Sequence, residues 1–223
     1  MFWKKQIENS QAININALID FTLLDPRATN QDLEKLCDIA YKNGYFGVCV
    51  NPANVAYVSG YIAKHFTGKL KVISVVGFPL GANSTQTKIS EAKEAIDAGA
   101  NEIDIVINIG KAKSGDYAYV KKEIEKLRKI SKRQILKVII ETCYFDENDI
   151  IKLSKICAAC RVDYIKTSTG FGTGGATKDV VSLIKKVVGN KCKIKASGGI
   201  KTREQVVEFV NAGASRIGTS SII

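Results

Sequence analysis

The sequence predicts an α/β protein whose single domain, residues 1–223, is a (β/α)8 TIM barrel. Three observations lead to this prediction. Eight short runs of apolar, mostly β-branched residues recur along the chain, with starts roughly 23 to 34 residues apart. The intervals carry helix signals, which is the alternation of a parallel sheet closed into a barrel. Only three prolines occur, and no Gly/Ser-rich linker separates a second domain.

Each of the eight apolar runs is short enough to be one strand, and most are bounded by glycine or polar residues. In chain order the expected strands are 17–24, 45–50, 71–78, 102–109, 136–142, 163–168, 193–197 and 216–221.

Helices are expected between these strands. The first shows one buried stripe at helical spacing: Leu33, Leu36, Cys37, Ala40 and Tyr41. Capping boxes are expected from Thr29 to Asp32 and from Thr202 to Gln205. Three glycines stand where a left-handed residue would end a helix before the next strand: Gly44, Gly99 and Gly213.

The two ends of the chain are expected to modify the barrel. Residues 1–14 are polar and amphipathic, which predicts an extra N-terminal helix covering the bottom of the barrel. The eighth strand run lies at the C-terminus, so we expect no eighth outer helix.

Composition and charge narrow the class of protein. No apolar run approaches the ~18 residues of a membrane span, and the N-terminal stretch lacks a signal-peptide core, so we expect a cytoplasmic protein without a membrane partner. The net charge of +11 permits binding of nucleic acid or of a phosphorylated small molecule. Because the lysines are spread over nearly every expected helix, we expect a solvated basic surface and no nucleic-acid partner.

The six cysteines lie within expected helices and strands, and we interpret them as free core thiols. The CAAC segment from Cys157 to Cys160 leaves a redox or zinc site as an alternative. A four-ligand zinc site would need further ligands, and His65 is the one histidine in the sequence. We therefore expect no metal.

Four charged residues stand inside expected interior strands, where they are rarely tolerated unless paired or used: Asp104, Lys137, Lys166 and Lys195. Their strands, the fourth to the seventh, are neighbours in a barrel, so the side chains can meet inside it. The alternative for each lysine is that it faces the helix layer and reaches solvent. A buried lysine beside a second cation has a lowered pKa, and a neutral amine attacks carbonyl groups. The pattern therefore indicates a functional cluster.

Glycine-rich segments follow the sixth and seventh strands, and the eighth strand run itself carries a glycine and small polar residues. They are the run Thr167 to Gly175, then Gly198-Gly199, and Gly218 to Ser221. In such barrels these loops commonly bind phosphate, because small residues let backbone N–H groups approach an anion. Ordinary loop and capping chemistry is the alternative, but three clusters at one end favour a phosphate site.

These residues carry a resemblance to the deoxyribose-phosphate aldolase family. The matching segments cover nearly the whole chain in family order: IDFTLL (19–24), VCVNP (48–52), GFPLGANST (77–85), EIDIVINIG (102–110), LKVIIETC (136–143), YIKTSTGFGTGGAT (164–177), IKASGGI (194–200) and IGTSS (217–221). The resemblance implies a metal-independent, cofactor-free class I aldolase that reversibly cleaves 2-deoxy-D-ribose 5-phosphate to D-glyceraldehyde 3-phosphate and acetaldehyde. It also implies a role in deoxyribose phosphate catabolism, and we expect a homo-oligomer, either a dimer or a tetramer.

The resemblance also implies roles for the four charged residues. Through YIKTSTG, Lys166 is the Schiff-base nucleophile. Through IKASGG, Lys195 is the cation that lowers the pKa of Lys166 and takes part in proton transfer. Asp104 is the proton donor and acceptor, and Lys137 is an accessory polar group. The substrate- and phosphate-binding residues are expected to be Thr169, Gly170, Gly198, Gly199, Ser220 and Ser221.

Two departures from the family pattern bear on the site. Many relatives carry a histidine where this chain has Phe21, and longer relatives continue past the GTSS segment, which here ends at Ile223. Both concern how the phosphate is held. Two other functions remain open: a different Schiff-base phosphosugar lyase or transaldolase on the same barrel, and nucleic-acid binding through the basic surface.

Overall fold

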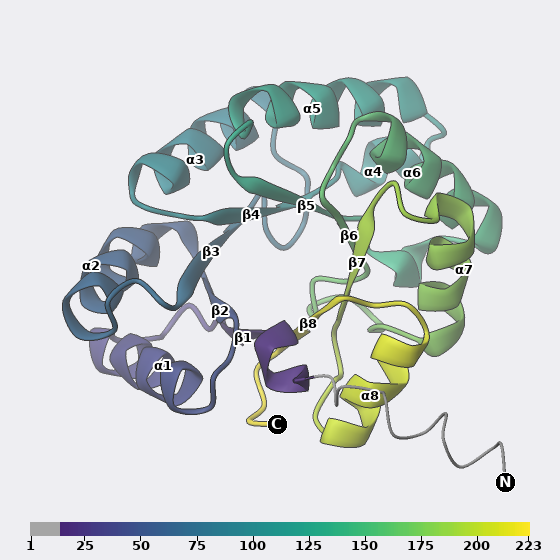
Figure 1. Cartoon of the computed structure of the whole chain (residues 1–223). Helices are drawn as coiled ribbons and strands as arrows, with labels where there is room; N and C mark the ends of the chain where they lie inside the picture. The colour runs from purple at the N-terminus through teal and green to yellow at the C-terminus, as the bar shows by residue number, and fades with distance from the viewer. Residues whose placement is uncertain (1–13) are drawn as a thin grey trace, which may run out of the picture.

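The computed structural model describes residues 14–223, and these form a closed barrel of eight parallel strands (Figure 1). The strands follow one another around the barrel in sequence order, and β8 pairs with β1 to close it. This confirms the predicted (β/α)8 TIM barrel. The strands are β1 (Ile19–Leu23), β2 (Gly47–Val50), β3 (Lys71–Val76), β4 (Glu102–Val106), β5 (Ile135–Ile139), β6 (Tyr164–Lys166), β7 (Lys193–Ser197) and β8 (Arg216–Thr219).

The helices surround the strands on the outside of the barrel (Figure 1). They are α1 (Asn30–Lys42), α2 (Val55–His65), α3 (Thr85–Asp97), α4 (Ile109–Lys113), α5 (Tyr117–Ile130), α6 (Glu147–Ala159), α7 (Lys178–Val188) and α8 (Arg203–Asn211). Short 3-10 turns are η2 (Ile15–Leu18), η3 (Pro52–Asn54) and η4 (Thr142–Tyr144). No helix follows β8 within the described residues, as expected. The predicted N-terminal helix falls almost wholly on residues 1–13, outside the described part of the chain.

The predicted helix ends are confirmed in detail. Both capping boxes form, at Thr29 and at Thr202, so each N-cap hydroxyl accepts the backbone N–H three residues on. Gly44, Gly99 and Gly213 all have positive φ angles. A glycine adopts this conformation without the steric cost that other residues bear, and so lets the chain leave the helix for the next strand.

Two local predictions were wrong for reasons that the structure shows, and most other strand ends differ from the predicted ones by up to three residues. Tyr41 is not part of the buried stripe of α1, because its ring is 43% exposed and stacks on Phe66 instead. The fourth strand ends at Val106 rather than at residue 109. The cause is Asn108, whose side chain accepts the N–H of Lys111 and thereby caps the additional short helix α4.

The alternation of side chains along the strands divides the core into two parts. Residues such as Ile103 and Ile105 of β4 pack in the large core between strands and helices. Their neighbours Glu102 and Asp104 point into the barrel. A smaller apolar cluster, made of Leu24, Cys49, Ile73 and Val75, is separate from the large core. The barrel interior is therefore apolar beside β2 and β3, and charged around β1 and β4–β8.

None of the helices that the structure describes is long and apolar enough to cross a membrane.

Candidate active site

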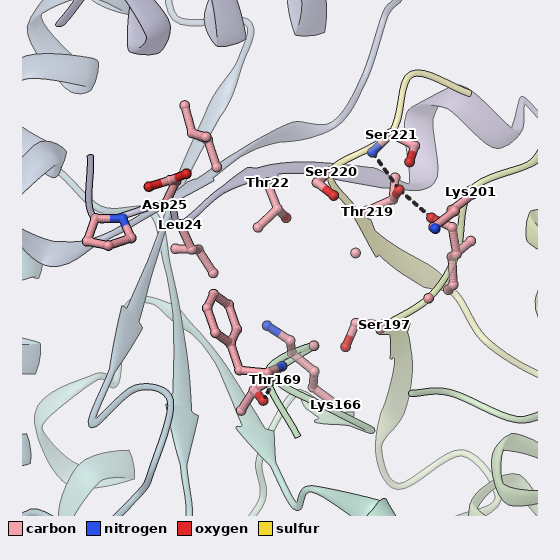
Figure 2. Close-up of a pocket in the computed structure, with 18 of the residues that line it drawn as sticks. Thr22, Leu24, Asp25, Lys166, Thr169, Ser197, Lys201, Thr219, Ser220 and Ser221 are labelled. Atoms are coloured by element: carbon pink, nitrogen blue, oxygen red, sulfur yellow. Dashed lines mark hydrogen bonds between the residues drawn. The ribbon is translucent and has the colours of Figure 1, made fainter. Parts of the chain in front are cut away.

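A cavity of about 610 Å³ opens at the end of the barrel where the strands finish. Its lining comes from the last residues of β1, β6, β7 and β8 and from the segments that follow these strands. Figure 2 shows the Lys166 side chain extending into this space, with Thr22, Ser197 and Ser220 around it. Active sites of (β/α)8 barrels lie at this carboxyl end of the strands. An amine that reaches the floor of such a cavity can meet a small molecule bound there.

The four charged residues that the sequence singled out meet inside the barrel. Asp104 contacts all three lysines: Oδ1 accepts from Lys137 Nζ at 2.8 Å, and Oδ2 accepts from Lys166 Nζ at 2.9 Å and Lys195 Nζ at 2.8 Å. All four side chains are buried. The strand register explains the arrangement, since Asp104 is paired with Lys137 and Lys166 with Lys195. None of the three lysines takes the alternative path to the helix layer.

Three further buried charges belong to the same network, and the sequence reasoning missed them. Asp20 of β1 accepts from Lys195 and, at 2.8 Å, from Arg216 of β8. Glu102 of β4 accepts from Arg216 at 2.9 Å and is paired with Lys137. A signal was present, because Glu102 stands two residues before Asp104 and so shares its face of the strand. Asp20 and Arg216 could have been sought as partners for the buried lysines once β1 and β8 were taken as neighbours.

The network holds its two aspartates ionised. Burial raises the pKa of Asp104, but the ammonium groups of Lys137, Lys166 and Lys195 outweigh it and hold the pKa well below its ordinary value of 3.8. Burial likewise raises the pKa of Asp20, and Lys195, Lys137 and Arg216 lower it further than burial raises it. Both aspartates are therefore negatively charged at neutral pH.

The same contacts keep two of the lysines protonated. Burial disfavours the charged form of Lys195, but the carboxylates of Asp104 and Asp20 overcome it, and the pKa of Lys195 is raised above its ordinary value. Lys137 behaves in the same way: burial lowers its pKa, Asp104 raises it, Lys195 opposes, and the net direction is upward. Lys195 and Lys137 therefore act as fixed cations beside Lys166.

Lys166 differs from the other three cations in its partners and in its access. Within residues 14–223 its amine contacts one carboxylate oxygen, Oδ2 of Asp104, whereas Lys137, Lys195 and Arg216 each contact at least two carboxylate groups. Among Lys137, Lys166 and Lys195, Lys166 is the one that lines the cavity formed by the described residues. It is therefore the one of the three lysines that a small molecule in the cavity can reach.

All six residues expected to bind the substrate and its phosphate line the cavity: Thr169, Gly170, Gly198, Gly199, Ser220 and Ser221. Gly170, Gly198 and Gly199 have φ angles of 86°, 88° and 78°, which a side chain rarely adopts. At Gly198 a Cβ atom would also lie 2.9 Å from Gly175 Cα. The positive φ angles and the close approach at Gly198 therefore require glycine in this part of the cavity wall.

Thr169 is turned differently from the other five. Its N–H and hydroxyl both donate to the carboxylate of Glu141, which lies just after β5. Its hydroxyl also accepts the N–H of Phe171 at 3.0 Å. The polar groups of Thr169 thus hold the loop in place, and its contribution to the cavity is its position in the wall.

Glu141 is a further residue that the sequence reasoning passed over. Its carboxylate is buried, and its backbone has a φ of 48°, a left-handed conformation that is strained for a residue with a side chain. Such strain is kept where the surrounding contacts determine it, often near functional sites. Here those contacts are the hydrogen bonds from Thr169, which tie the end of β5 to the glycine-rich loop after β6.

Phe21 does not face the lysines. The alternation along β1 directs Asp20 and Thr22 to the barrel interior and Phe21 into the outer core, where the centre of its ring lies 5.5 Å from that of Tyr45.

The cysteines are all free: burial raises the pKa of Cys160 to about 11, and the pKa of Cys157 is raised well above its ordinary value. Across residues 14–223 no group of three or more His, Cys, Asp or Glu side chains is arranged to hold a metal ion.

The fold and the site together define a class of protein: a (β/α)8 barrel enzyme with a buried, cavity-facing lysine and a glycine-rich cavity wall beside it. Comparison with known proteins makes the class specific. A family model described as DeoC/LacD family aldolase matches residues 14–221. The chain belongs to this aldolase family.

Relatives and solved structures agree with the family assignment. The deoxyribose-phosphate aldolase of Thermococcus gammatolerans is 49% identical over 211 residues, covering 94% of this chain and 93% of the relative. A solved structure described as QR15, an aldolase, superimposes with a TM-score of 0.89 at 40% identity, covering 93% of this chain and 92% of that one. A tetrameric deoxyribose phosphate aldolase from Aeropyrum pernix superimposes with a TM-score of 0.85 at 33% identity, covering 92% and 86%.

Proposed function

We propose that this chain is a class I aldolase that reversibly cleaves 2-deoxy-D-ribose 5-phosphate to D-glyceraldehyde 3-phosphate and acetaldehyde, as a step in the breakdown of deoxyribose phosphates. Residues 1–223 act as one aldolase domain. The observation that carries the proposal is the position of Lys166, which is buried in a network of fixed charges and yet opens onto the cavity. The protonated imine that Lys166 forms with the substrate is the electron sink, so the reaction needs neither a metal nor a cofactor.

Lys166 acts as the nucleophile. Its neutral amine attacks the C1 aldehyde to form a carbinolamine, which loses water to give a protonated imine. A base removes the proton of the C3 hydroxyl, the C2–C3 bond breaks, and the electron pair moves into the imine. C3 becomes the aldehyde of glyceraldehyde 3-phosphate, and an enamine of acetaldehyde remains on Lys166. Protonation at C2 and hydrolysis then release acetaldehyde and restore the amine.

Asp104 and Lys195 move the protons. Asp104 Oδ2 accepts hydrogen bonds from both Lys166 and Lys195, so a proton can pass between the two amines through one oxygen. From there Asp104 reaches the reacting carbons through water, as general base and then as general acid. In the resting site the positive charge of Lys195 disfavours a second cation at Lys166 and so favours the neutral nucleophile. Lys137 is accessory: it holds the other oxygen of Asp104 at 2.8 Å.

The phosphate of the substrate binds at the glycine-built wall. Backbone N–H groups at Gly170, Gly198 and Gly199 and the hydroxyls of Ser220 and Ser221 provide donors suited to an anion. These residues share the cavity with Lys166, which supports a substrate that spans from the amine to the wall. Thr169 takes part by fixing the loop that carries Gly170.

The proposed function also bears on the location of the protein, its oligomeric state and its partners. We propose a cytoplasmic homo-oligomer, a dimer or a tetramer, that acts on a small phosphorylated sugar and binds neither nucleic acid nor a membrane. The tetrameric aldolase from Aeropyrum pernix supports an oligomer in this family. The location of the reactive lysines inside the barrel supports a small substrate, because interior lysines cannot bind nucleic acid.

A product assay with matched variants tests the proposal. The purified protein should convert 2-deoxyribose 5-phosphate to equal amounts of acetaldehyde and glyceraldehyde 3-phosphate. Lys166→Met should abolish this, while Lys178→Met, which removes an exposed lysine of α7, should leave it unchanged. Products with another carbon split would favour a different phosphosugar lyase or a transaldolase, and full activity of Lys166→Met would refute the assigned nucleophile.

A further inference from the structure

Arg216 and Glu102 form a second layer of the buried network, away from the cavity. The guanidinium of Arg216 lies 3.4 Å from the centre of the Phe46 ring and donates to Asp20 Oδ1 at 2.8 Å and to Glu102 Oε2 at 2.9 Å. Neither Arg216 nor Glu102 belongs to the lining of the cavity formed by residues 14–223. They therefore cannot touch a substrate bound there, and any effect on the reaction is transmitted through other residues.

We propose that Arg216 and Glu102 are positioning residues that set the number of protons in the buried network and so keep the nucleophile neutral. This inference rests on the proposed function, in which Lys166 attacks the substrate as a neutral amine. It goes beyond the pairing of Lys166 with Lys195, because it assigns the control of protonation to the whole network, including two residues remote from the cavity.

Seven charged side chains face one another inside the barrel. Strand by strand they are Asp20 (β1), Glu102 and Asp104 (β4), Lys137 (β5), Lys166 (β6), Lys195 (β7) and Arg216 (β8), and all are at most 5% exposed. β2 contributes the Cys49 thiol, β3 contributes apolar side chains, and β6 adds the Tyr164 hydroxyl. Three carboxylates thus face four basic groups.

The balance of buried charges requires one of the four basic groups to give up its proton. With all four protonated the buried network carries one uncompensated positive charge, which is costly away from water. With one neutral amine the network is balanced. Arg216 does not deprotonate in proteins, and the carboxylates around Lys137 and Lys195 raise the pKa of each. Lys166 has the weakest carboxylate pairing of the four, so the inference assigns the missing proton to it.

Two variants should shift the acid limb of the kcat/KM profile in opposite directions. Arg216→Met removes a cation, so the network is balanced only when Lys166 is protonated, and the acid limb of kcat/KM should move to higher pH. Glu102→Gln removes a carboxylate, so protonated Lys166 becomes less favourable, and the acid limb should move to lower pH. For charges separated by one layer of side chains, each shift should be on the order of one pH unit. Structural damage alone would not move the two profiles in opposite directions.

The experiment compares pH profiles of kcat/KM for 2-deoxyribose 5-phosphate in the wild type, Arg216→Met, Glu102→Gln and Arg216→Lys, over the range in which circular dichroism shows each to be folded. Arg216→Lys retains the charge and should keep the wild-type acid limb even if the rate falls. Profiles that do not move, or that move in the same direction, would overturn the inference. If Arg216→Met does not fold, the other two variants still test the inference. The acid limb should then move to lower pH in Glu102→Gln and stay at the wild-type pH in Arg216→Lys.

Reductive trapping separates the inference from the proposed function. The same samples are treated with borohydride in the presence of substrate and mapped by peptide mass spectrometry. A wild-type adduct at a residue other than Lys166 contradicts the proposed function. An adduct at Lys166 together with unmoved pH profiles contradicts only the role of Arg216 and Glu102.

Discussion

Lys166 and Lys195 donate to the same oxygen atom, Oδ2 of Asp104, at 2.9 and 2.8 Å. Two amines that share one acceptor are close enough for the charge of one to govern the protonation of the other. They differ in their second partners, because Lys195 is also paired with Asp20 whereas Lys166 opens onto the cavity. This asymmetry underlies the proposed division of roles between Lys195, a cation in the resting site, and Lys166, the nucleophile.

Replacement of Lys195 tests this division. Lys195→Leu removes a fixed cation, and the remaining three carboxylates and three basic groups then balance with Lys166 protonated. We expect kcat/KM at neutral pH to fall roughly a hundredfold or more and to recover partly as the pH rises. Lys195→Arg restores the charge and should restore the shape of the pH profile. An unchanged profile in Lys195→Leu would refute the coupling.

Acid stability should depend on the buried aspartates. The pKa of Asp20 is lowered in the folded protein, so the unfolded chain binds more protons as the pH falls through the ordinary value of 3.8. The stabilisation from Asp20 is therefore fully present above that pH and is lost below it.

At alkaline pH the relevant group is Lys195, whose pKa is raised in the folded protein. Its contribution to stability is present below its ordinary pKa of 10.5 and is lost as the pH rises through the folded-state pKa.

Urea unfolding at a series of acidic pH values checks this. Asp20→Asn should lower the free energy of unfolding at neutral pH by about 3–5 kcal/mol, because it leaves buried cations uncompensated. It should also show a weaker loss of stability on acidification than the wild type. Asp97→Asn, which changes an exposed aspartate of α3, should follow the wild-type curve. A steep acid dependence retained in Asp20→Asn would contradict the assignment.

Glu141 should affect binding of the phosphate more than the chemistry at Lys166. Glu141→Gln weakens the hydrogen bonds to Thr169 that hold the glycine-rich loop, and the loss of a buried charged acceptor is worth about 1–3 kcal/mol. We expect KM for 2-deoxyribose 5-phosphate to rise roughly tenfold, with little change for unphosphorylated 2-deoxyribose. Equal losses with both substrates would show that Glu141 does not act through the phosphate wall.

Replacement of Gly198 tests whether the cavity wall formed by Gly170, Gly198 and Gly199 binds the phosphate, as proposed. Gly198→Ala places a side chain at a φ of 88° and within 2.9 Å of Gly175 Cα, so both stability and phosphate binding should fall. Gly44→Ala is the matched control, because Gly44 also has a positive φ but has nothing within 4 Å of the added Cβ. Both variants should lose about 1–2 kcal/mol from the strained backbone. A raised KM is expected for Gly198→Ala alone.

The barrel could be predicted because each strand carries its own local signal and the helix signals between strands repeat. Element ends could be predicted where one residue determines them, as at Thr29 and Gly99. They were missed where a capping side chain competes with an apolar run, as at Asn108, whose helix α4 replaces the end of the predicted strand. Tyr41 fits the spacing of a buried stripe, but its position at the edge of α1 leaves the ring exposed.

The gathering of Asp104, Lys137, Lys166 and Lys195 could also be predicted, since charges with the same inward face on neighbouring strands must meet. The wider network could not be read in the same way. Asp20 and Lys195 stand 175 positions apart and meet only because β8 closes on β1. Glu141 lies within the expected strand 136–142 and the matching segment LKVIIETC, but its role depends on a left-handed backbone and on the loop that it holds, which the sequence pattern does not show.

Reductive trapping of the enzyme with its substrate tests the central claim most directly. Protein incubated with 2-deoxyribose 5-phosphate and borohydride, then digested and sequenced by mass spectrometry, should carry a reduced N-ethyl group on Lys166. The same treatment of Lys195→Leu at neutral pH should give much less adduct, at the same residue. An adduct on Lys137, Lys195 or any other residue, or no adduct while the enzyme turns over, would contradict the claim that Lys166 forms the Schiff base.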